Sequence, residues 1–167
     1  KYLIVNKDNK KALCATQGSN NRSAVDISFD AEDNISIVPS GVCVLELQEP
    51  ETGKWAFYDA SNSGYLYAAS SSKNYLRTQT TLDNNSKATI TVTTAGVATI
   101  KFTGSNSRNL LRYNETSTLF SCYSSGQKDV YLYHYVVPTG TKDPELSYSS
   151  SSFTIAANGT PTQQPTL

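Results

Sequence analysis

The sequence is poor in several residue types on which catalysis and nucleic-acid binding depend. Its 167 residues include no methionine, one histidine and one tryptophan. Only 17% are charged, and 14 Lys and Arg balance 14 Asp and Glu, so the formal net charge is zero. Phosphate affinity comes from clustered Lys and Arg, so this balance argues against a nucleic-acid partner. No apolar run approaches the ~20 residues that cross a bilayer as a helix, which argues against membrane insertion.

Residues for nucleophilic catalysis are equally scarce. Such catalysis needs a base beside a serine or cysteine, and the one histidine is His134, in VYLYHYVV. Alternation places His134 on an apolar face with Val130 and Leu132, where a hydrogen-bonded structural role is the simpler interpretation. The acidic residues share no spacing that would pair two carboxylates for glycoside hydrolysis. We therefore predict no catalytic residues, and a hydrolase is a minor alternative.

Metal and cofactor motifs are also missing from the sequence. No His/Cys set has zinc-like spacing and no glycines form a phosphate loop, so we predict neither a metal nor a cofactor. The acidic run 30–34 has oxygen ligands for calcium but lacks the EF-hand pattern, and a solvated acidic turn is favoured. Cys14, Cys43 and Cys122 are an odd number without a CxxC pair. We expect buried free thiols, with a Cys14–Cys43 disulfide as the alternative.

The abundant residues are those of strands and turns. The chain has 22 Ser, 19 Thr, 13 Asn and 11 Tyr, a composition that favours strands and turns over helices. Apolar and polar residues alternate in short runs at the spacing of an all-β sandwich or barrel. The twelve predicted strands are 2–6, 11–16, 24–29, 42–48, 54–59, 64–69, 75–80, 88–93, 98–103, 109–113, 119–123 and 130–136.

These runs repeat in groups of four. The stretches beginning at Trp55 and Ala98 share the order strand, SNS turn, strand, Ser/Asn turn, strand, polar loop, strand. The first stretch follows the same order with an insertion near 31–39. Three four-stranded units predict an antiparallel β-barrel of the β-trefoil type over residues 1–137, and an irregular barrel or sandwich is the alternative.

The composition changes after residue 137. PTGTKDP at 138–144 predicts a linker. Residues 145–167 have one or two strand patterns and then end, which predicts the incomplete start of another module. Because the chain begins at Lys1 without a methionine, we expect a processed form or a piece of a longer chain with neighbouring domains.

Three stretches carry a resemblance to a known family, namely KYLIVNKDNKKAL, KWAFYDASNSGYLYAASSSKNYL and NLLRYNETSTLFSCYSSGQKDVYLY. Over residues 1–136 the chain resembles β-rich modules repeated in secreted and surface-anchored proteins of Bacteroides-type gut bacteria. Its tail resembles the first strands of bacterial immunoglobulin-like domains. The resemblance implies an extracellular or cell-surface location, at the outer membrane, and an accessory or adhesive role. It supplies no catalytic residues.

Tyrosine provides the strongest binding signal. Alternation puts Tyr65 and Tyr67 on one strand face and Tyr75 and Arg77 on the same face of the next strand, opposite leucines expected in the core. Tyr58 lies in the preceding hairpin. Aromatic faces stack on sugar C–H groups while Arg and Asn bond hydroxyls, so this patch suits a glycan. The alternative is that the tyrosines are cross-strand packing pairs.

Arg112, in SRNLLRYNET, is a second candidate for ligand contact. Its strand has leucines on both faces, so the alternation does not decide which face is buried, and an ion-pair role is the alternative. The leading functional hypothesis is a non-catalytic extracellular module that binds a glycan or another surface ligand. The rival is a structural spacer or assembly module in a multidomain surface protein.

Overall fold

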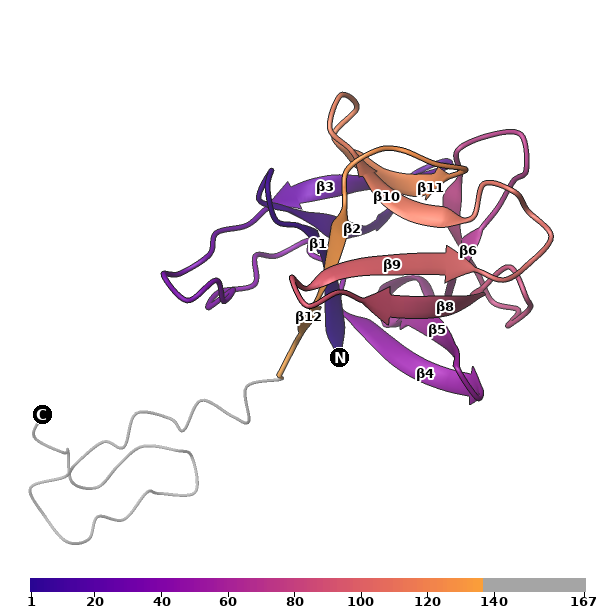
Figure 1. Cartoon of the computed structure of the whole chain (residues 1–167), viewed down its shortest axis with the longest axis horizontal. Helices are drawn as coiled ribbons and strands as arrows, with labels where there is room; N and C mark the ends of the chain where they lie inside the picture. Colours follow the sequence, from indigo (N-terminus) through magenta and orange to yellow (C-terminus); the bar gives the residue numbers. More distant parts are fainter. Residues whose placement is uncertain (137–167) are drawn as a thin grey trace, which may run out of the picture. The chain divides into compact units, whose positions relative to one another are not determined.

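Within the described residues, the regular secondary structure is almost entirely β-strand (Figure 1). The computed structural model describes residues 1–136, and within that range it contains twelve strands, one short 3₁₀ helix and no α-helix. The elements are β1 Tyr2–Asn6, β2 Lys11–Gln17, β3 Arg22–Asp26, β4 Leu45–Glu51, β5 Lys54–Asp59, η1 Ala60–Asn62, β6 Gly64–Ala68, β7 Leu76–Gln79, β8 Lys87–Val92, β9 Val97–Phe102, β10 Leu110–Asn114, β11 Leu119–Tyr123 and β12 Val130–His134. The predicted linker at 138–144 and the predicted immunoglobulin-like segment at 145–167 lie outside the described residues.

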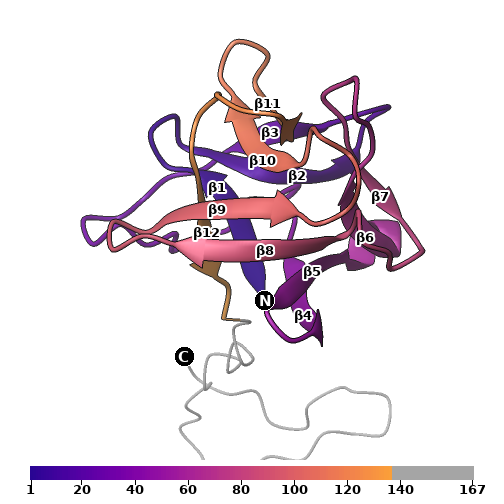
Figure 2. The same ribbon diagram turned by 45° about the vertical axis from the view of Figure 1, so that its right-hand side comes forward.

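Six of these strands close into a barrel. Antiparallel pairing runs from β1 to β12, then through β9, β8, β5 and β4 back to β1. Figures 1 and 2 show β8 and β9 side by side in this wall. The β4–β1 joint is the thinnest, because Tyr2 opposite Leu45 is its only register pair. Closure leaves no long unpaired edge in the ring.

The other six strands form three hairpins, β2–β3, β6–β7 and β10–β11. The hairpins contact one another: β11 pairs with β3, and the Leu76 amide donates to the Asn20 carbonyl at 2.8 Å. Each of the units β1–β4, β5–β8 and β9–β12 therefore gives two strands to the barrel and one hairpin to its cap. This arrangement is the β-trefoil that the repeated pattern predicts.

Alternation along strands such as β6, β9 and β10 builds much of the core. In β6 the side chains of Leu66 and Ala68 are fully buried, while Tyr65 and Tyr67, which alternate with them, are half-buried on the outside. All three units contribute to the main apolar cluster, which includes Ile4, Leu13, Phe57, Leu66, Ile100, Leu111 and Phe120. The period-2 geometry of a strand explains why these residues alternate with polar ones in the sequence.

A buried ion pair joins the first two units. Arg22 on β3 is fully buried, and its guanidinium donates to the Asp59 carboxylate, which is also buried. The remaining donors reach Gln17 Oε1 at 2.9 Å and the Ala15 carbonyl at 2.8 Å. Asp59 in turn accepts from the backbone of η1, including Ser61 N at 3.0 Å. Sequence analysis did not identify Arg22 as a core residue.

The segment 27–44 between β3 and β4 interrupts the threefold repetition. The equivalent segments of the other units are 80–86 and 124–129, which are much shorter. This long loop packs on a second apolar cluster, in which Leu3 and Val5 of β1 meet Ile27 and Val42. Tyr133 of β12 also belongs to that cluster. The insertion predicted near 31–39 is therefore a folded part of the barrel's outer surface.

The three cysteines are free thiols, as expected, and the alternative Cys14–Cys43 disulfide is not formed. Cys43 and Cys122 are buried in the main core. Cys14 differs from the expectation, because it is only half-buried. Burial raises the pKa of the Cys43 thiol to about 12 and raises that of Cys122 as well.

Candidate functional site

The predicted tyrosine patch lies on the outer face of β5, β6 and β7. Tyr58 is opposite Tyr65, and Tyr67 is opposite Arg77, so four of the predicted residues are neighbours by strand register. Leu66, which the prediction assigned to the core, is fully buried. The structure therefore brings these residues onto one surface.

Within this patch the side chains largely contact each other. The rings of Tyr58 and Tyr65 pack edge to face with centroids 5.2 Å apart, and the Tyr65 hydroxyl donates to Gln48 Oε1 at 3.3 Å. The guanidinium of Arg77 stands 4.8 Å from the Tyr75 ring centroid and donates to Asn20 Oδ1. These are the contacts of cross-strand packing pairs, the alternative that the sequence left open.

Arg112 lies apart from the patch, on the hairpin β10–β11. Its guanidinium is 2.6 Å from Asp129 Oδ1. Leu111 and Tyr113 of the same strand are buried, whereas Arg112 is on the outer face. Its observed partner is thus a carboxylate, as in the ion-pair alternative.

His134 differs from the expectation for a buried, hydrogen-bonded residue. It ends β12, where the barrel wall meets solvent, and its side chain is exposed. Its ring packs on Tyr2, with centroids 5.3 Å apart. Alternation correctly groups it with Val130, but only Val130 is deep enough to be buried.

A groove that sequence analysis did not identify lies between the long loop and β12. Its volume is about 370 Å³, at the lower end of the range for small-ligand sites. It is lined by Lys7, Asn34, Ala95, Gly96, Tyr131, Leu132, Tyr133 and His134. Four segments thus meet here: the β1–β2 turn, the long loop, the β8–β9 turn and β12. We call it the β12 groove.

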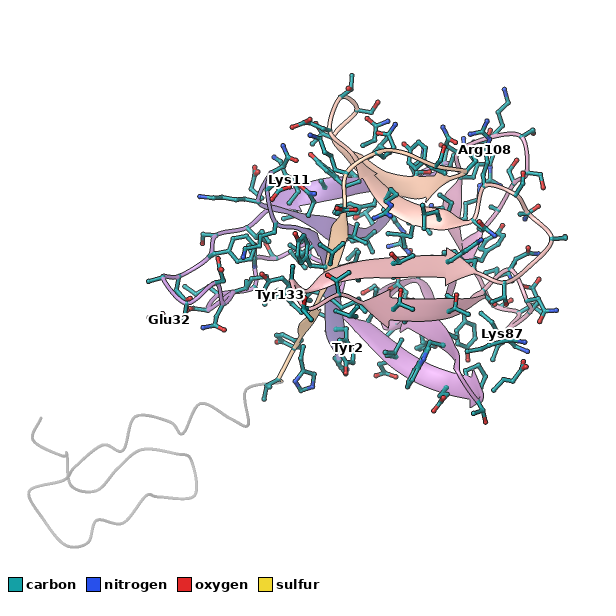
Figure 3. The ribbon with its side chains drawn as sticks, viewed as in Figure 1. Tyr2, Lys11, Glu32, Lys87, Arg108 and Tyr133 are labelled. Carbon is teal, nitrogen blue, oxygen red and sulfur yellow. The ribbon has the colours of Figure 1, made fainter. Side chains whose placement is uncertain are left out.

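Two tyrosines form its aromatic wall. Tyr131 and Tyr133 point away from the core because Val130 and Leu132 alternate with them and pack inward. Tyr131 lies over Gly96, where a methyl group would stand 3.7 Å from its Cδ1 atom. Tyr133 packs on Phe29 of the long loop at 5.5 Å between centroids. In Figure 3, Tyr133 is on the same side of the barrel as the loop that carries Glu32.

An ion pair stands beside these rings. Lys7 Nζ is 2.6 Å from Asp33 Oδ2, with side chains 35% and 61% exposed. The hydrogen bond to Asp33 raises the pKa of Lys7, and burial opposes this rise. Burial raises the pKa of Tyr133, and the nearby charges of Lys7 and Asp33 act on it in opposite directions. The ammonium, the carboxylate and the phenol therefore lie in one electrostatic neighbourhood.

The loop holds Asp33 in an unusual conformation. Its φ is +62°, in the left-handed region that few residues other than glycine adopt. Asp30 braces this turn, because its Oδ1 accepts from Glu32 N at 3.0 Å and Asn34 N at 2.8 Å. Its Oδ2 accepts from the Ser36 hydroxyl at 2.9 Å. The acidic run is thus a hydrogen-bonded turn, as the sequence favoured over a calcium loop.

Within residues 1–136, no three His, Cys, Asp or Glu side chains come together as a metal site would need. The same part of the chain contains no helix that is long and apolar enough to cross a membrane.

A second groove, of about 380 Å³, lies on the hairpin cap. The β2–β3 turn and the β10–β11 turn form it, with Thr16, Gly18, Ser19, Asn20, Asn21, Ser23, Ser117, Thr118 and Leu119 as its lining. It has hydroxyl and amide groups but no aromatic ring and no charge. The β12 groove therefore offers more kinds of ligand contact than the cap groove.

The comparisons with known proteins extend only to the fold. No family model matches the sequence, and no curated protein matches it either. Among solved structures, a β-1,3-galactosidase of glycoside hydrolase family 43 is 14% identical, with a TM-score of 0.54 over 80% of this chain and 26% of that chain. A GlcNAcα1-4Gal-releasing endo-β-galactosidase from Clostridium perfringens is 12% identical, with a TM-score of 0.56 over 78% and 31%. The designed three-fold symmetric protein ThreeFoil is 15% identical, with a TM-score of 0.48 over 81% and 89%.

The two glycosidases resemble this chain over only part of their own length. The chain spans about a quarter to a third of the two glycosidases. At such low identity, the likeness to them is one of fold. The resemblance to bacterial surface modules and to immunoglobulin-like segments is not tested by these matches and stays a prediction.

Proposed function

We propose that this chain is a non-catalytic glycan-binding module and that the β12 groove is its binding site. The observation that carries the proposal is the convergence of two outward tyrosines with Lys7 in one groove, where Lys7 is paired with Asp33 of the adjoining loop. Aromatic rings contact the C–H faces of sugars, while charged and amide groups bond their hydroxyls. The likeness of fold to parts of two glycosidases is compatible with an accessory role.

The long loop supports the choice of this groove. Loops of this length without secondary structure are uncommon in compact domains and are usually functional. Asp33 lies in this loop in the left-handed conformation, which aspartate and asparagine tolerate better than most residues. In this conformation its carboxylate accepts a hydrogen bond from Lys7.

The tyrosine patch on β5–β7 is the secondary site in this proposal. Its rings and Arg77 already have intramolecular partners, so a ligand would have to compete with those contacts. Following the resemblance, we place the protein outside the cell or on its surface, in a longer chain that positions a partner on glycans.

A glycan array with the full chain, followed by calorimetric titration of the strongest hits, tests the proposal. We expect binding that Tyr131→Ala abolishes and that the matched patch variant Tyr65→Ala leaves unchanged. Loss of binding in Tyr65→Ala alone would transfer the function to the predicted patch. Silence across host and plant glycans would reject glycan binding and favour the spacer.

A further inference from the structure

We infer that the β12 groove selects neutral saccharides that present two adjacent free hydroxyls, which bind across the Lys7–Asp33 pair. This inference rests on the proposed function and adds the class of sugar. The geometry behind it is an exposed ion pair directly beside an aromatic wall.

The charge at the groove favours a neutral ligand. Lys7 is the cationic side chain of the lining, and its ammonium is already neutralised by Asp33. An anionic sugar would bring its carboxylate close to the Asp33 carboxylate, which repels it. His134 is the other basic side chain in the lining, and its ring packs on Tyr2 in a tilted arrangement.

The ion pair matches two adjacent hydroxyls. An ammonium has three donors, and Lys7 uses one of them on Asp33 Oδ2. The pair is therefore a donor next to an acceptor. One sugar hydroxyl accepts from Lys7 Nζ while its neighbour donates to Asp33, and both bonds are charge-assisted.

The rings fix which sugar edge reaches the pair. Tyr131 and Tyr133 are consecutive outward residues of β12, and Lys7 lines the same groove. A sugar ring whose C–H face lies on this wall directs its hydroxyl edge toward Lys7. Gly96 keeps the space above Tyr131 free of a side chain.

Another exposed ion pair provides the control. Lys54 Nζ lies 2.6 Å from Glu51 Oε1 at the β4–β5 turn, also between partly exposed side chains. Neither Lys54 nor Glu51 lines the β12 groove, whereas Lys7 does. The two pairs therefore separate the effect of a surface charge from the effect of the groove.

The test compares Asp33→Asn and Lys7→Met with Lys54→Met, using the neutral glycan that binds best on the array. Asparagine tolerates the left-handed conformation, so Asp33→Asn removes the charge and keeps the turn. We expect both groove variants to weaken binding about tenfold or more, as the loss of a charge-assisted hydrogen bond does, and Lys54→Met to bind normally. If Asp33→Asn alters the loop, the binding measured for Lys7→Met still tests the role of the ion pair.

The matched ligand is the same glycan after periodate oxidation and borohydride reduction, which destroys adjacent hydroxyl pairs. We expect it not to bind, and we expect sialylated and uronic-acid glycans to bind at least tenfold more weakly than the neutral glycan. Binding that depends on Tyr131 but survives Asp33→Asn, Lys7→Met and periodate would overturn this inference and leave glycan binding intact. A preference for acidic glycans would overturn it as well. Absence of any Tyr131-dependent binding would reject the proposed function itself.

Discussion

Two ion pairs in this protein have the same chemistry but differ in burial. Arg22 with Asp59 and Lys7 with Asp33 are both ion pairs of a long cation and an aspartate. The first is sealed in the core, where an unpaired charge has no solvent to stabilise it. The second is open to solvent, where ion pairs contribute little to folding. The buried pair therefore matters for stability, and the exposed pair is available to a ligand.

Arg22→Met should be strongly destabilising, because it leaves the Asp59 carboxylate buried without its cation. Breaking one side of a buried pair costs about 3–5 kcal/mol, and we expect a loss of that size in urea unfolding monitored by tryptophan fluorescence. The exposed-pair variant Lys54→Met should unfold almost like the parent. A loss under about 1 kcal/mol for Arg22→Met would contradict the buried pairing.

The cysteines should differ in reactivity. The thiolate is the reactive form, and burial raises the pKa of Cys43 to about 12, so this thiol stays protonated at pH 8. Cys122 is buried in the same core and should be equally inert. With a chromogenic disulfide reagent, we expect one fast thiol, Cys14, in the native protein and three after unfolding. Fast reaction of two or more native thiols would refute this assignment.

At the scale of elements, the long loop between β3 and β4 forms one side of the β12 groove. Its apolar residues, such as Ile27 and Phe29, pack outside the barrel against β1 and β12. That packing brings Asn34 to the same groove as Tyr131, although nearly a hundred residues separate them. The loop turn depends on one carboxylate, Asp30, which accepts hydrogen bonds from three residues.

The loop should therefore loosen in acid. The backbone hydrogen bond from Asn34, with further bonds from Ser36 and Glu32, holds the pKa of Asp30 below its usual 3.8. Because the folded pKa is the lower one, this contribution is present above the unfolded value and is lost as pH falls through the folded value. We expect amide signals of residues 30–36 to change below about pH 4. Asp30→Asn should abolish this pH dependence, and its persistence would assign the transition to another group.

The strands themselves were largely predictable. GYLYA at β6 alternates so regularly that the sequence assigns Leu66 inward and its tyrosines outward, as observed. The predicted strand boundaries were wrong where a polar residue is buried or where an apolar residue packs in the long loop. The third strand begins at Arg22 and not at the predicted residue 24, because Arg22 is a buried ion-pair partner. The fourth begins at Leu45 and not at 42, because Val42 packs in the loop cluster.

The site was less predictable than the strands. In the structure, Tyr131 and Tyr133 share one outward face of β12, opposite Val130 and Leu132, as the alternation along a strand requires. Alternation cannot show that Lys7 and Asn34 reach the same place, since that depends on how the long loop packs. The usable signal was the insertion in the first unit, which has no counterpart in the other two units.

At the scale of the whole molecule, the β12 groove combines features of two different units of the trefoil. In the last strand of each unit, the first fully buried residue is followed by a residue on the opposite strand face. That residue is Tyr131 in β12, Glu46 in β4 and Thr89 in β8. The aromatic wall therefore belongs to the third unit and the long loop to the first. Neither feature recurs around the pseudo-threefold axis.

The stoichiometry should follow from this asymmetry. We expect calorimetry to give one bound glycan per chain, although a trefoil with equivalent units could bind three. A control titration of Tyr131→Ala should show no residual site. A stoichiometry of two or three, or a second site that survives in Tyr131→Ala, would mean that the cap groove or the tyrosine patch also binds.

The most direct test of the account is a map of where the glycan contacts the protein. Two-dimensional NMR of the labelled full chain, titrated with the best neutral glycan from the array, supplies that map. The account predicts shifts concentrated at Lys7, Asn34, Gly96, Tyr131 and Tyr133. Shifts centred on Tyr58, Tyr65 and Tyr75, with the β12 groove unchanged, would contradict it.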